Sequence, residues 1–74
     1  MEGNLVKKGI YLRVEQVESL AGVVFENRKK GKRKLNESLL CRVALDVLFN
    51  LNLNFAQYET EKDLREAIIN KVRN

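Results

Sequence analysis

The sequence contains no histidine, no proline and no tryptophan, and it has only one cysteine and one methionine. A single cysteine, Cys41, cannot form an internal disulfide, and the missing histidines exclude a zinc site built from Cys and His ligands. The commonest general base and most nucleophile–base pairs of enzymes are missing as well. We therefore expect no enzyme: no catalytic residue, no metal, no cofactor and no small-molecule substrate.

The chain is short, and its 74 residues allow one domain at most. With 45% hydrophobic and 32% charged residues, its composition is typical of a globular domain and argues against disorder. A core of this size stabilises a lone chain only weakly, and the usual remedies are disulfides, a metal or oligomerisation. A disulfide is excluded, and although a metal site of carboxylates alone is formally possible, no acidic cluster has the spacing of a metal-binding loop, so we expect an oligomer.

Positive charge is concentrated in the N-terminal half. Residues 1–34 carry nine Lys and Arg against four Asp and Glu, whereas residues 35–74 carry five against six. This asymmetry favours a polyanionic partner, either nucleic acid or an anionic membrane surface. No apolar run approaches the roughly 20 residues of a membrane span. The first four residues lack the apolar core of a signal peptide, so we expect a cytoplasmic protein with Cys41 reduced.

The residues before the first helix alternate between apolar and polar side chains. Ile10, Leu12 and Val14 fall on one parity, and this alternation predicts a strand over about residues 8–14. The opposite parity holds Lys7, Gly9, Tyr11 and Arg13.

Three amphipathic segments follow, and they predict helices over about 15–30, 36–52 and 61–73. The second begins at Asn36 and the third after Thr60, and both residues are good N-caps. Between the first two helices lies a basic run, residues 28–34, with six cations in seven positions.

A lone strand has no partner within its own chain, so its backbone groups and apolar face would be left uncovered. Two copies that pair antiparallel about a twofold axis solve both problems. We expect residues 1–52 to form this dimeric core and residues 53–74 to form a helical extension. The predicted dimer core consists of Ile10, Leu12, Val14, Leu40, Val43 and Val47.

The polar parity of such a ribbon faces outward. A two-stranded ribbon fits the major groove of B-DNA, where Arg and Lys bind guanine. The predicted base contacts are therefore Lys7, Tyr11 and Arg13. The other interpretation is a solvated outer face, which every amphipathic strand has.

Two segments, Ile10-Tyr11-Leu12-Arg13-Val14 and residues 35–45 (LNESLLCRVAL), resemble the strand and the second helix of ribbon-helix-helix repressors of the MetJ/Arc/CopG type. The resemblance covers about residues 7–52. It implies a mainly α fold with one strand: a homodimer with an intersubunit antiparallel ribbon, here followed by a third, C-terminal helix.

The resemblance also implies that the second helix grips a phosphate through its N-terminal amides. With the basic run before it, the predicted phosphate contacts are Lys30, Lys32, Arg33, Lys34, Asn36, Glu37 and Ser38. Glu37 opposes a phosphate there, and Gly9 has no side chain to read a base. The basic run has two other interpretations, a solvated helix end and a nuclear localisation signal.

The long basic loop and the third helix depart from the family pattern, and the added helix is similar to that of small ribbon-helix-helix proteins of archaeal viruses. We expect a homodimeric, sequence-specific protein that binds double-stranded DNA, most simply a transcriptional repressor. The alternative is a protein-interaction module such as an antitoxin, in which the C-terminal helix docks onto a partner protein.

Overall fold

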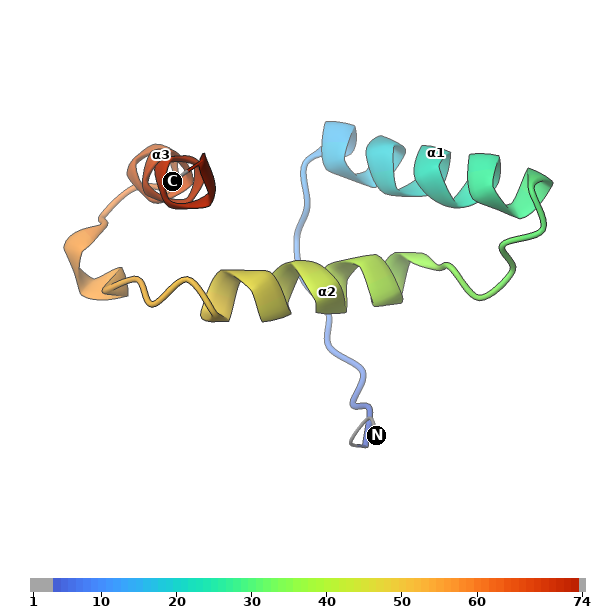
Figure 1. Cartoon of the computed structure of the whole chain (residues 1–74), viewed down its shortest axis with the longest axis horizontal. Coiled ribbons are helices and arrows are strands. Elements are labelled where there is room, and N and C mark those ends of the chain that lie inside the picture. Colours follow the sequence, from blue (N-terminus) through green and yellow to red (C-terminus); the bar gives the residue numbers. More distant parts are fainter. Residues whose placement is uncertain (1–3, 74) are drawn as a thin grey trace. The chain divides into compact units, whose positions relative to one another are not determined.

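The computed structural model describes residues 4–73 and contains three α-helices, α1 (Val14–Lys29), α2 (Glu37–Phe49) and α3 (Glu61–Arg73), with a short 3-10 helix η1 (Phe55–Gln57) between the last two (Figure 1). The prediction of a mainly helical fold is confirmed. Two compact units divide the chain, residues 1–35 and residues 36–74. Residues 1–3, at the start of the predicted region 1–52, and residue 74, at the end of the predicted region 53–74, lie outside the described residues.

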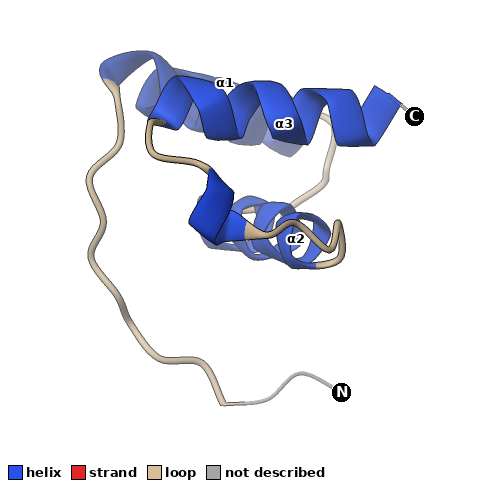
Figure 2. Ribbon diagram, turned by 90° about the vertical axis from the view of Figure 1, so that its left-hand side faces the viewer, coloured by secondary structure: helices blue, strands red, loops and turns tan. Residues whose placement is uncertain are grey.

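Residues 4–13 precede α1 as an exposed extended segment, drawn as a loop in Figure 2. No residue of 4–13 lies in a strand. A strand whose partner belongs to a second copy has no neighbour in a single chain, so the strand over 8–14 stays a prediction. Its end is shifted, because Val14 is the first residue of α1: the carbonyl of Arg13 already accepts the amides of Gln16 and Val17 at 3.0 and 3.1 Å.

The C-terminus of α1 is closed by two backbone hydrogen bonds. Lys32 donates its amide to the carbonyl of Asn27 at 2.9 Å, and Gly31 donates to Arg28 at 3.0 Å. This Schellman arrangement needs a left-handed residue, and Gly31 supplies it with φ of 85°. Helix α1 therefore ends at Lys29, one residue before the predicted end, and the chain leaves it in a defined turn.

Helix α2 begins where its sequence predicts, because the Asn36 side chain accepts the amide of Leu39 at 2.8 Å. It ends at Phe49, three residues before the predicted end. Asn50 bonds its side chain back to the carbonyl of Asp46 at 2.8 Å, and Asn52 adopts a positive φ of 58°. Both are conformations that asparagine favours at helix ends.

The connection from α2 to α3 contains η1, which the sequence analysis did not predict. Asn54 caps it by accepting the amide of Ala56 at 3.2 Å. Phe55 then packs edge to face against Phe49, with ring centroids 5.9 Å apart. This aromatic pair fastens the connection to the end of α2.

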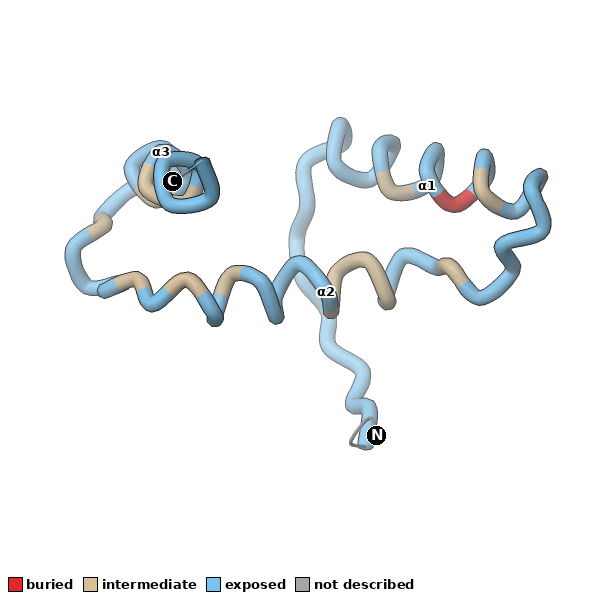
Figure 3. Tube along the Cα trace, in the orientation of Figure 1, coloured by how far each residue is buried: buried red, intermediate tan, exposed pale blue. Residues whose placement is uncertain are grey.

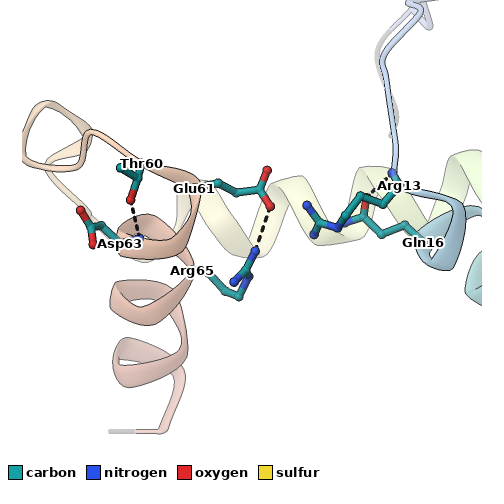
Figure 4. Close-up of polar contacts among 6 residues, drawn as sticks. All are labelled: Arg13, Gln16, Thr60, Glu61, Asp63 and Arg65. Atoms are coloured by element: carbon teal, nitrogen blue, oxygen red, sulfur yellow. Dashed lines mark hydrogen bonds and ion pairs between the residues drawn. The ribbon is translucent and has the colours of Figure 1, made fainter.

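Helix α3 has the N-cap that its sequence predicts. The Thr60 hydroxyl accepts the amide of Asp63 at 3.1 Å, and one turn along the helix Arg65 pairs with Glu61 at 2.9 Å (Figure 4). Both charges of this pair are exposed, so it contributes little to stability. The observed bounds equal the predicted 61–73.

Very little of the apolar surface is covered in a single chain (Figure 3). Among the described residues, Val24 on α1 alone is buried, with 7% of its surface exposed. Helices α2 and α3 contain no buried residue. None of the helices within residues 4–73 combines the length and apolarity needed to cross a lipid bilayer.

Candidate nucleic-acid interface

The three predicted base contacts lie before α1 or at its start. Lys7 and Tyr11 are exposed in the extended segment, and the whole side chain of Tyr11 is accessible to solvent. Arg13 is the N-cap residue of α1, with an extended backbone (φ −71°, ψ 153°). Its guanidinium has donors only and cannot cap the helix amides. The accessible phenol of Tyr11 and the side chain of Arg13 thus lie two residues apart, the spacing of one strand face.

The basic turn, which we define as residues 28–34, is ordered by the Schellman bonds described above. Lys30, Lys32 and Arg33 are exposed on it. Lys29 differs, because its ammonium lies 4.8 Å from the centre of the Phe25 ring and 3.9 Å from the Glu26 carboxylate. The turn therefore holds its exposed cations on a hydrogen-bonded backbone, which would lower the entropy lost if they bound an anion.

The N-terminus of α2 follows the basic turn directly in sequence, across Leu35. Asn36 satisfies the amide of Leu39, and the positive end of the helix dipole lies at this point. Glu37 is the acidic residue of the first turn, and both it and Ser38 are exposed. Backbone amides and the Ser38 hydroxyl can donate to a phosphate here, whereas the Glu37 carboxylate repels one.

Helix α1 separates the two kinds of predicted contact within the first unit. Its 16 residues span about 24 Å at roughly 1.5 Å per residue. The base contacts lie at its start and the basic turn at its end. Within the first unit, the structure therefore places the predicted base contacts and the basic turn at opposite ends of α1.

The predicted dimer core is largely uncovered in the single chain. Leu40 is half-buried, whereas Val43 and Val47 on the same helix are about half exposed. In the extended segment, Ile10 exposes 61% and Leu12 40% of its surface. Val14, at the start of α1, is exposed as well.

One residue at this end of α1 was missed by sequence reasoning. The Gln16 side chain reaches back and accepts the backbone amide of Arg13 at 2.9 Å (Figure 4). A glutamine three residues after the N-cap is the second half of a capping box, and that spacing was the available signal. Without Ser, Thr, Asp or Asn at the first position, the pattern was not recognised.

No protein-family model, curated protein or solved structure matches this chain. In the part of the chain that the structure describes, no group of three or more His, Cys, Asp and Glu residues is placed to hold a metal ion. The interpretation of the interface therefore depends on its own residues.

Removing the charge of Glu37 provides a direct test of the phosphate site. We expect Glu37→Gln to bind random duplex DNA about tenfold more tightly at low salt, because two repulsions of roughly 0.7 kcal/mol at about 6 Å are removed from a dimer. Fluorescence anisotropy measures the affinity. Glu59→Gln changes the net charge equally outside α2, and an equal gain with this variant would contradict a phosphate site at Glu37.

Proposed function

We propose that this chain is a homodimeric, sequence-specific protein of the ribbon-helix-helix type that binds double-stranded DNA and represses transcription. The observation that carries the proposal is the exposed extended segment before α1. In it, the apolar Ile10 and Leu12 alternate with the polar Lys7, Tyr11 and Arg13.

An extended segment with one apolar face is unstable in water when it stands alone. Pairing with the same segment of a second copy satisfies the backbone donors and acceptors of both and turns Ile10 and Leu12 toward a shared core. The opposite face of that ribbon then presents two copies of Lys7, Tyr11 and Arg13. A ribbon of this width enters the major groove, where a guanidinium can bind the O6 and N7 atoms of guanine.

The basic turn and the start of α2 supply the remaining part of the proposed interface. Their exposed cations and amides would contact the phosphates beside the groove and hold the ribbon in register. Phosphate contacts add affinity without sequence preference, whereas the ribbon adds the preference. A repressor needs both, because it must find a short site among an excess of other DNA.

The experiment that tests this function begins by selecting bound sequences from random duplex DNA. We expect the wild-type protein to enrich a short, partly palindromic site. Arg13→Ala should weaken binding to that site by about 10- to 100-fold, since a bidentate base contact is worth roughly 1–3 kcal/mol. Its affinity for random duplex should change by less than about threefold.

Arg13→Lys is the matched control, because it keeps the charge and removes the planar fork that binds guanine. We expect it to lose most of the selectivity that Arg13→Ala loses. Equal losses on the selected and random duplexes would mean that Arg13 contacts only phosphate, and failure to enrich any site would overturn the proposed function.

A further inference from the structure

The backbone of Arg13 is fully occupied by its own chain. Its amide donates to Oε1 of Gln16 at 2.9 Å, and its carbonyl accepts the amides of Gln16 and Val17 at 3.0 and 3.1 Å. In an antiparallel ladder, a hydrogen-bonded pair exchanges both groups of each residue. Arg13 therefore has neither group left for a second copy, so the last hydrogen-bonded pair of a ribbon can lie no later than Leu12.

The same hydrogen bonds fix the direction in which the Arg13 side chain leaves the backbone. The extended φ and ψ of Arg13 are held between the carbonyl bonds to the first turn of α1 and the side chain of Gln16 (Figure 4). Losing the Gln16 bond would free the amide of Arg13 and the rotation about its φ. The guanidinium lies several bonds further out, so a small rotation at φ displaces it by much more than the backbone moves.

We infer that Gln16 is a positioning residue that ends the ribbon and sets Arg13 for base recognition, so that it determines selectivity without contacting the base that Arg13 reads. This inference rests on the proposed function. It predicts that removing Gln16 lowers the selectivity between DNA sequences and leaves the affinity for random duplex DNA nearly unchanged.

The test compares the ratio of affinities for the selected site and for random duplex. Gln16→Ala should lower this ratio by about tenfold, because two misplaced guanidiniums lose part of their bidentate contacts. Its affinity for random duplex should stay within about threefold of wild type. In parallel, hydrogen exchange measured by NMR should show faster exchange of the Arg13 amide, with the Leu12 amide still protected in the dimer.

Gln16→Glu is the conservative variant. A carboxylate oxygen can accept the Arg13 amide at the same place, and it is favourable in the first turn of a helix. Its added negative charge should weaken binding to both duplexes by a similar factor, so the ratio should stay near the wild-type value. If Gln16→Glu keeps the ratio of affinities for the selected site and random duplex while its affinity for both falls, Gln16 acts by positioning Arg13 and not by contacting a phosphate.

Thr60→Ala is the matched structural control. It removes one capping bond, from the Thr60 hydroxyl to the Asp63 amide, at a helix for which no DNA contact is proposed. It should destabilise its helix end as Gln16→Ala does and leave the ratio unchanged.

Three results would overturn the inference. An unchanged ratio in Gln16→Ala, despite faster exchange of the Arg13 amide, would show that Gln16 only caps α1. A comparable fall of the ratio in Thr60→Ala would attribute the effect to general destabilisation. A wild-type protein without preference for any duplex sequence would overturn the proposed function itself, and it would be seen before any variant is measured.

Discussion

Val47→Asp is expected to abolish the dimer and, with it, most of the helical structure at micromolar concentration. Val47 lies on α2 four residues after Val43, and about half of each side chain is exposed in the single chain. The predicted dimer core would bury both side chains. A carboxylate buried there without a partner costs several kcal/mol, and a dimer contains two. The dissociation constant of the dimer should therefore rise at least roughly thousandfold. Sedimentation and far-ultraviolet circular dichroism measure the two effects.

Leu45→Asp is the control on the same helix. Leu45 exposes 51% of its surface against 50% for Val47, so a single chain gives no reason to treat them differently. Two residues along a helix, however, place the two side chains about 160° apart, on opposite sides. We expect the Leu45 variant to remain a dimer. A dimer that persists with Val47→Asp would contradict the prediction that Val47 lies in the dimer core.

The reason for expecting so large an effect is the composition of α2. Apolar side chains occupy almost its whole circumference, and its polar residues beyond the first turn are limited to Arg42 and Asp46. A helix with this much apolar surface is expected to be covered along its main apolar stripe, which contains Val43 and Val47 but not Leu45. Yet none of its residues is buried in the single chain. We therefore expect the free energy that holds this helix to come mainly from the predicted contact with a second copy.

Local signals allowed the starts of two helices to be predicted from the sequence. Asn36 and Thr60 each accept a backbone amide three residues ahead, a contact that depends on the residue and its immediate neighbours only. The end of α2 was predicted three residues too late. Leu51 and Leu53 extend the apolar pattern, but Asn50 and Asn52 compete locally for backbone conformation and end the helix.

The candidate site was less predictable than the helices. The hydrogen bond from Arg13 to Gln16 was missed because arginine is not a residue that caps helices, although the glutamine spacing was present. The ordering of the basic turn could be predicted in part, since Gly31 signals a helix end. The predicted strand would depend on a second copy, and a contact between chains leaves no trace in the fold of one chain.

The basic turn provides the largest expected effect on DNA binding. Replacing Lys30, Lys32 and Arg33 by Gln removes six cations from a dimer. If each contacts one phosphate, the slope of log affinity against log salt should fall by about 0.9 per contact, roughly five units in all. At about 150 mM salt, affinity for random duplex should drop by at least about a hundredfold. Titrations at several salt concentrations measure the slope.

The matched control removes the same charge elsewhere. Replacing Lys62, Lys71 and Arg73 of α3 by Gln lowers the net charge of each chain by three, as the turn variant does, but leaves residues 28–34 intact. We expect its slope to stay within about one unit of the wild type, because cations that touch no phosphate release no counterions. If the slope and the affinity for random duplex fall equally in both variants, only the total charge matters and the turn is a solvated helix end. A loss confined to the turn variant would identify residues 28–34 as the phosphate-binding element, since their ordered backbone and their place directly before Asn36 are what α3 lacks.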